Sequence, residues 1–368
     1  MLKRLSIFAL CIAALGFKSC NTEFSVNGNY QITPVVMGVL DHGDSVHIIK
    51  ITKAYLGDGD NLVYAQIPDS NYFKTVEATV VEFDEDGIET GREWTLMDST
   101  ITNKDTGVFY APEQQIYYFV EDELKENYEY ELRATCYDSE TQFHSIDART
   151  TMINGFGIAS PAIFASDRIN FNGATVNSDA DYKTYNFTVT EALNASLYNY
   201  KYTFRWREYY LDGTEQDFAL VRNNEDIIQE SYTQANSHTA IYRGLEFFRW
   251  LGGYTNTGGA EVEGVISPDP DLERRVVLGI DIRISIAHHN LEQFMNVSKP
   301  QTGIAQAQPE FTNVNGGLGL FSSRHIFELI DYRLSKNSMK ELCNGQYTGD
   351  LQFCSNYAED VTESYYCF

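Results

Sequence analysis

The chain has 368 residues, with 27 basic and 52 acidic side chains and a formal net charge of −25 at pH 7. A surface this acidic repels nucleic acid and anionic lipid head groups, so the composition excludes a nucleic-acid-binding role. The length is too great for one small hydrophobic core and fits two domains. Tyr and Phe are abundant (25 and 22) and Pro is scarce (8), which favours a mainly β protein.

Residues 1–19 have the features of a secretory signal peptide. Lys3 and Arg4 form a short basic segment, and an uncharged apolar run follows from Leu5 to Phe17. That run is too short to cross about 30 Å of hydrocarbon as a helix. No later apolar run is long enough to cross either, so we expect no transmembrane segment after the leader.

Cys20 follows this leader directly. Ser19 is the small residue that precedes the lipid-modified cysteine in bacterial lipoprotein signals, whereas Lys18 departs from the usual uncharged residue. We expect cleavage before Cys20 and a diacylglycerol on its thiol, with residues 20–23 as the tether of a lipid-anchored protein. The alternative is an ordinary secretory leader cut near Ser19.

Residues 24–150 are expected to form the first β domain. Side chains alternate in polarity after residue 127, which predicts a strand with one buried face. Leu124 lies four residues before Tyr128, a spacing that resembles the tyrosine corner of fibronectin-III and immunoglobulin-like sandwiches. The resemblance implies an Ig-like β-sandwich. The face expected to be buried comprises Tyr128, Tyr130, Leu132, Ala134 and Cys136.

Residues 151–161 contain glycines and a proline and are expected to be a linker. Residues 162–335 then form a second β-rich domain with one or two short helices. Its strongest strand, Leu278–Ile286, places five aliphatic side chains on one face, which predicts a central strand. His288 and His289 follow, and we expect a solvated pair at the strand end, then a short helix. We expect no metal site.

A helix is predicted over Thr239–Leu251, because apolar residues recur there at helical spacing. Phe247, Trp250 and Tyr254 form a second stripe beside its main apolar face. This helix either packs on a sheet or presents an aromatic surface to a sugar ring or a partner protein.

Besides Cys11 and Cys20 the sequence has four cysteines, three of them in the tail, residues 336–368. An even number in an exported protein predicts disulfides. We first expect Cys343 to pair with Cys354, which leaves Cys136 to pair with Cys367, although the sequence allows all three pairings. The cysteine spacings and the absence of a nearby His do not match a zinc site.

The sequence contains no Gly-x-Ser-x-Gly and no His-Glu-x-x-His motif. The glycine-rich run 313–324 lacks the Lys-Ser/Thr of a phosphate loop, so its glycines are expected to allow a tight turn. We therefore expect no catalytic residue, no cofactor and no enzyme. A hydrolase with dispersed carboxylates remains an alternative.

The leader, the β-rich N-terminal half and the Asn-x-x-Gly-Gly-x-Gly-x-Phe-Ser-Ser pattern at 313–323 together resemble uncharacterised outer-membrane lipoproteins of the Bacteroidetes. The resemblance implies an anchor in the outer membrane, facing the periplasm or the cell surface. It also implies a binding or accessory role, with a TonB-dependent transporter as the candidate partner. The alternative partner is a glycan, bound by an adhesin.

Overall fold

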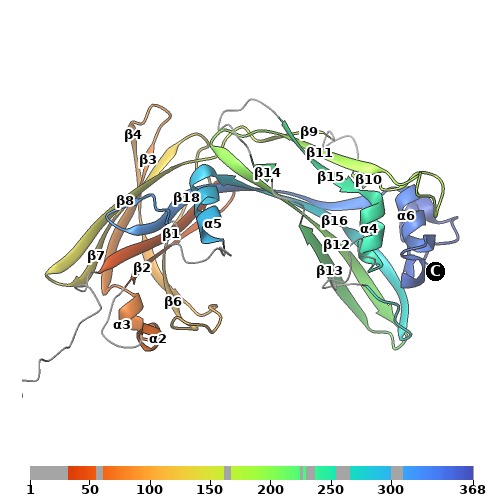
Figure 1. Ribbon diagram of the computed structural model, residues 1–368, viewed down its shortest axis with the longest axis horizontal. Coiled ribbons are helices and arrows are strands. Elements are labelled where there is room, and N and C mark those ends of the chain that lie inside the picture. The colour runs from red at the N-terminus through yellow and green to blue at the C-terminus, as the bar shows by residue number, and fades with distance from the viewer. Residues whose placement is uncertain are drawn as a thin grey trace, which may run out of the picture.

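The computed structural model describes residues 32–54, 61–160, 167–223, 227–228, 237–253, 266–299 and 310–367. As predicted, the fold is mainly β. The described residues form three sheets and few short helices. Figure 1 shows an elongated molecule, with the first strands in one half and the C-terminal tail at the far end of the other. No helix in the described ranges is long and apolar enough to cross a membrane.

The N-terminal half consists of two facing sheets. One has the order β1-β2-β6-β5, and the other has the order β17-β8-β7-β3-β4. Two helices of one turn each, α2 (Asn61–Tyr64) and α3 (Pro68–Asn71), lie between β2 and β3. The strands are β1 (Thr33–Asp41), β2 (Val46–Ala54), β3 (Thr75–Phe83), β4 (Glu89–Thr95), β5 (Met97–Ile101), β6 (Gln114–Val120), β7 (Glu129–Ser139), β8 (Gln142–Thr151) and β17 (Val314–Asn315).

The N-terminal core fills the space between these two sheets. Strand β1 contributes Val36, β6 contributes Phe119 and β7 contributes Leu132, each at most 1% exposed. Burying an aliphatic or aromatic side chain of this size stabilises the fold by about 1.5–3 kcal/mol. The predicted buried face of β7 is confirmed from Tyr130 to Cys136.

The tyrosine that closes the corner before β7 is Tyr130, not Tyr128. The Tyr130 hydroxyl accepts the backbone N–H of Lys125 at 2.8 Å and donates to Glu82 at 3.1 Å. Tyr128 precedes the strand and is half-buried. The alternation of the strand begins two residues later than its apolar pattern indicates, because Asn127 has a left-handed φ of 65° that ends the turn there.

The C-terminal half pairs a three-stranded sheet, β15-β11-β9, with the strands β13-β12-β16-β18. The longer strands are β9 (Gly157–Ser160), β11 (Thr184–Thr190), β12 (Ala195–Tyr210), β13 (Glu215–Asn223), β15 (Ser237–Arg243), β16 (Leu272–His288) and β18 (Leu318–Leu334). The other elements are β10 (Arg168–Ile169), β14 (Ile227–Ile228), β19 (Phe353–Cys354), α4 (Gly244–Leu251), α5 (His289–Ser298), α6 (Lys336–Asn344), η1 (Gly349–Leu351) and η2 (Ala358–Asp360).

Strand β16 is the central strand that the sequence predicts, since β12 and β18 pair with its two edges. Its buried face differs by one residue from the expected set. The pairing with β12 shifts register beside Gly279, so that Trp206 lies opposite Val277. Val277 is therefore buried and Leu278 is half-buried, because a bulge reverses the alternation of side chains.

The segment Thr239–Leu251, expected to be one helix, begins as a strand and becomes helical only in its second part. Ala240 and Tyr242 alternate inward on β15, and α4 begins only at Gly244. A Cβ at Gly244 would lie 2.0 Å from the carbonyl oxygen of Phe171, so the backbones touch where the strand becomes a helix. Helical spacing of apolar residues did not reveal this change, because β15 is only seven residues long.

Strand β18 belongs to both halves. From Leu318 to Arg324 it runs parallel to β1, and from Arg324 onward it runs antiparallel to β16. Its Phe321 packs in the N-terminal core and its Leu329 in the C-terminal core. One continuous eleven-stranded sheet therefore extends through the molecule, and β18 crosses the junction between the halves (Figure 1).

The glycine-rich run before β18 makes the predicted tight turn. Gly316, with φ of 74°, moves the chain from β17 in one sheet to β18 in the other. Gly319 has φ of 102°, and a Cβ there would lie 2.0 Å from the carbonyl oxygen of Val36. Only glycine allows β18 to approach β1 this closely.

The tail packs against the end of the C-terminal half, and its disulfide joins Cys354 to Cys367. The expected pairs Cys343–Cys354 and Cys136–Cys367 are both wrong. Cys136 is fully buried in the N-terminal core, far from the tail, and Cys343 is a buried free thiol of α6. The Cα atoms of Cys354 and Cys367 lie 5.1 Å apart, a normal distance for a disulfide.

Candidate metal centre

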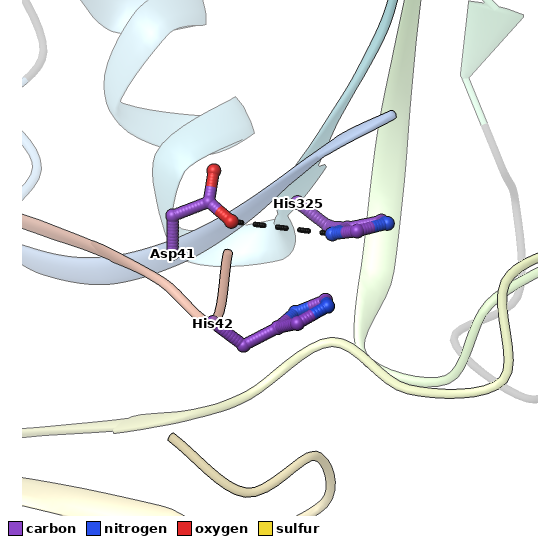
Figure 2. A group of neighbouring side chains, drawn as sticks. All are labelled: Asp41, His42 and His325. Atoms are coloured by element: carbon purple, nitrogen blue, oxygen red, sulfur yellow. Dashed lines mark ion pairs between the residues drawn. The ribbon is translucent and has the colours of Figure 1, made fainter. Parts of the chain in front are cut away.

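Three side chains with metal-ligating atoms meet at the junction of the two halves. Asp41 ends β1 and His42 follows it, while His325 lies on β18. Asp41 pairs with Arg324 in the parallel ladder, so the next residue of β18, His325, lies beside the end of β1. One ligand atom from each of the three residues lies within 4.8 Å of the others (Figure 2).

Asp41 is the buried carboxylate of this cluster, at 2% exposure. Its Oδ1 lies 4.0 Å from His325 Nδ1 and accepts the backbone N–H of Gly43 at 3.1 Å. Its Oδ2 lies 3.3 Å from Arg324 Nε. Burial raises the pKa of the Asp41 carboxyl, and the Gly43 hydrogen bond opposes that rise.

The two imidazole rings are stacked, with centroids 4.2 Å apart and ring planes 16° from parallel. Figure 2 shows one ring above the other and the Asp41 carboxylate directed at His325. Burial, reinforced by the adjacent His42, lowers the pKa of His325 to about 4. The His325 ring is therefore neutral at pH 7, which is the form that binds metals.

Both Nδ1 atoms, of His42 and His325, are buried without a hydrogen-bond partner among the described residues. Leaving a buried polar atom unpaired costs about 1–3 kcal/mol, so such atoms call for an explanation. The His325 ring also packs against Phe156, with centroids 5.7 Å apart.

Glu126 extends the cluster from the segment between β6 and β7. Its Oε1 lies 3.6 Å from His42 Nε2, and its Oε2 accepts the backbone N–H of Gly155 at 3.5 Å. Segments that are distant in sequence therefore converge here. Two imidazoles and one or two carboxylates form a ligand set typical of zinc and related transition metals.

The described residues among the predicted site residues lie outside this cluster. Cys20 lies outside the described residues, as does Tyr254. Phe247 is 1% exposed and packs in the core, so it cannot present its ring to a sugar, which corrects its assignment to a surface. Trp250 is half-buried, edge-on to Tyr202. The interpretation of α4 as a helix packed on a sheet fits these contacts.

His288 is also corrected, because it is 2% exposed and not solvated. Its Nδ1 accepts the backbone N–H of Asn290 at 3.2 Å, so the ring caps the N-terminus of α5. The His289 ring packs against it, with centroids 3.9 Å apart. The expected helix is confirmed and extends over ten residues.

Sequence reasoning missed Asp41, His42 and His325. Metal-binding motifs are recognised by short spacings, and more than 280 residues separate His42 from His325. The available signal was weak: an Asp-His pair at the end of one strand and an Arg-His pair within another. Only the parallel pairing of β1 with β18 brings them together.

No family model and no curated protein sequence matches this chain.

Proposed function

We propose that this protein is a lipid-anchored accessory or binding component of a bacterial outer membrane. The leader ending at Cys20 carries this proposal, because a short apolar run followed by a small residue and a cysteine is the pattern of lipoprotein export. The acidic composition is compatible with a protein that stays soluble outside the cytoplasm. The resemblance to Bacteroidetes lipoproteins supports the same location.

Both halves are, in this proposal, Ig-like sandwiches. If strands are lettered A to G along the chain, the N-terminal sheets have the orders A-B-E-D and G-F-C-C′. The C-terminal sheets have the orders A-B-E and G-F-C-C′. This is the strand order of Ig and fibronectin-III-like domains. The Tyr130 corner at the start of strand F supports the assignment of the first half.

The role we infer is to present binding surfaces at a fixed distance from the membrane. Two sandwiches joined by an ordinary linker can reorient, whereas these halves share β18 and one continuous sheet. A rigid arm of this kind suits an accessory protein that contacts a neighbouring outer-membrane transporter. The glycan-binding alternative has less support, because Phe247 is in the core.

Lipidation is tested by fractionation of cells that express the full chain with its leader. The wild-type protein and a Cys11→Ala variant, which changes the other leader cysteine, are expected in the outer-membrane fraction. When the cells are grown with a labelled fatty acid, Cys20→Ala is expected to incorporate no label and to appear in the soluble fraction. A Cys20→Ala protein that still fractionates with membranes would refute the anchor.

The accessory role is tested separately, by purification of the lipidated protein in mild detergent after cross-linking in cells. Recovery of a TonB-dependent transporter with the wild-type protein, and its loss with Cys20→Ala, is the expected result. Recovery of the protein as a lone species would count against an accessory role while leaving the anchor intact.

A further inference from the structure

We propose that Asp41, His42 and His325 bind one divalent transition-metal ion, with zinc as the first choice, and that the ion fastens the two halves together. Asp41 and His42 belong to the N-terminal half, at the end of β1. His325 lies where β18 pairs with Ile286 of β16, in the C-terminal half. An ion held by all three is a cross-link at the junction. This site is independent of the lipid anchor and of any partner.

The unpaired nitrogens give the first reason for a metal. The buried Nδ1 atoms of His42 and His325 have no hydrogen-bond partner among the described residues, yet each belongs to a side chain beside a carboxylate. Each of these nitrogens could donate its unused lone pair to a bound cation, which would give both atoms a partner.

The charges around Asp41 give the second reason. Arg324 lies against Oδ2 of Asp41, which leaves Oδ1 directed at His325. One available carboxylate oxygen and two imidazoles favour a borderline-soft ion such as zinc. Calcium and magnesium prefer six or more oxygen ligands, which this cluster does not supply.

Coordination requires a small rearrangement. Ligand atoms about 2.0–2.1 Å from a tetrahedral ion lie about 3.3 Å apart, whereas Asp41 Oδ1 and His325 Nδ1 are 4.0 Å apart. The lone pairs of two stacked imidazoles lie in nearly parallel planes and do not converge on one ion. One ring must therefore rotate. His42 can do this, because it lies in the turn that closes with the Asp44 N–H to Asp41 carbonyl hydrogen bond.

Glu126 would support the site as the hydrogen-bond acceptor that orients His42. It is already 3.6 Å from His42 Nε2 and is bound to the backbone of Gly155. Acceptors that orient a metal ligand in this way commonly change metal affinity by about 10–100-fold.

The test is zinc titration of the whole mature chain, made soluble by Cys20→Ser and freed of metal with a chelator. We expect one ion per chain. His42→Ala and His325→Ala are each expected to weaken binding at least tenfold, and Glu126→Gln to weaken it less. His144→Ala, at a half-buried histidine of β8, is the matched control and should bind as the parent does.

Two further measurements distinguish a His42 that binds the metal from a His42 that only supports the fold. Cobalt bound at this site should give the visible absorption of a tetrahedral ion, and that absorption should be lost in His42→Ala. Zinc at hundredfold excess over its Kd should raise the Tm of the parent by about 5 °C and leave that of His42→Ala unchanged.

His42 lies in a turn, so its variant is expected to fold even if His325→Ala does not. The proposal fails if zinc, cobalt, nickel and copper all fail to bind the parent chain. It also fails if His42→Ala binds zinc with unchanged affinity and stoichiometry.

Discussion

His288 shows how one buried side chain can make stability depend on pH. Its Nδ1 accepts the Asn290 N–H, which only an unprotonated nitrogen can do. Burial, helped by the neighbouring His289, lowers the pKa of His288 to about 3. In the unfolded chain a histidine has a pKa near its usual value of about 6.5. Between these two values the unfolded state binds more protons than the folded state does.

We therefore predict that the free energy of unfolding falls as the pH is lowered from about 6.5 towards 3. The slope due to this residue reaches about 1.4 kcal/mol per pH unit. His288→Asn keeps a good helix cap and removes the proton-binding group, so its slope should be shallower than that of the parent. Urea unfolding from pH 4 to 7 measures the difference. His144→Asn is the control, and equal slopes in the parent and His288→Asn would contradict this prediction.

The ion pair between Glu208 and Arg275 is buried between β12 and β16. Both residues are at most 5% exposed, and Arg275 Nε donates to Glu208 Oε1 at 2.7 Å. Arg275 also donates to the carbonyl oxygens of Leu351 and Ser267, and the bond to Leu351 ties η1 of the tail to the sheet. Removing one member of such a pair leaves the other charge buried without its partner.

Arg275→Met is predicted to lower the free energy of unfolding by about 3–5 kcal/mol. The matched control is Arg207→Met, which removes an exposed ion pair with Asp217 from the same sheet. That change should cost much less, because solvent screens an exposed ion pair and Asp217 is not left buried. Denaturant unfolding measures the loss of free energy of unfolding in both variants. Equal losses would show that burial of the Glu208–Arg275 pair is not the cause of the larger effect.

At the level of single residues, the sequence predicted which side chains are buried better than it predicted which residues contact one another. The inward face of β7 followed from alternation, because Tyr130 and Leu132 obey a period that local chemistry imposes. The contact of Asp41 with His325 depends on which strands pair, and no local pattern encodes that. The Cys354–Cys367 pair has the same cause, since the fold of the tail chooses among three options.

At the level of elements, β18 depends on one glycine. Gly319 combines a left-handed φ of 102° with a backbone oxygen where a side chain would be. The glycines of this run were predicted to allow a turn, which Gly316 makes. The close approach of Gly319 to β1 could not be predicted, because it arises between strands that are far apart in sequence.

Gly319→Ala is predicted to destabilise the protein by at least about 3 kcal/mol, since the new methyl group overlaps the Val36 carbonyl. Gly213→Ala provides the control. Gly213 also has a left-handed φ, of 84°, but nothing lies within 4 Å of the new Cβ, so the cost should be only about 1–2 kcal/mol. Thermal unfolding compares the two, and a Gly319→Ala loss no larger than the control would show that the contact relaxes easily.

The elements that the sequence predicted best are those whose pattern is long and regular. β16 alternates strictly from Ile280 to Ile286 and is central, as expected. The helix at 239–251 was predicted too long, because the apolar residues of β15 happen to match a helical period. A change from strand to helix within thirteen residues is set by contacts such as that of Gly244 with Phe171.

At the level of the whole molecule, the shared strand couples the two halves. A chain with an ordinary linker at 151–161 should unfold in two steps. Here the loss of either half frees part of β18 and so weakens the other half. We expect one cooperative transition.

Tryptophan fluorescence tests this coupling, because Trp94 lies in the N-terminal half and Trp206 lies in the C-terminal half. A Trp206→Phe, Trp250→Phe variant leaves Trp94 as the only tryptophan, and Trp94→Phe leaves the C-terminal pair. Leu329→Ala, in the C-terminal core, should shift both signals equally to lower urea concentration. A shift of the C-terminal signal alone would show that the halves unfold independently.

The parallel pairing of β1 with β18 has a mechanical consequence. If the protein is tethered at its N-terminus and pulled at its far end, tension enters at the start of β1 and leaves at the end of β18. The two strands are then loaded lengthwise in opposite directions, and the hydrogen bonds from Val35–Leu318 to Asp41–Arg324 share the force at once. A ladder loaded in shear resists rupture far better than one that is peeled open bond by bond.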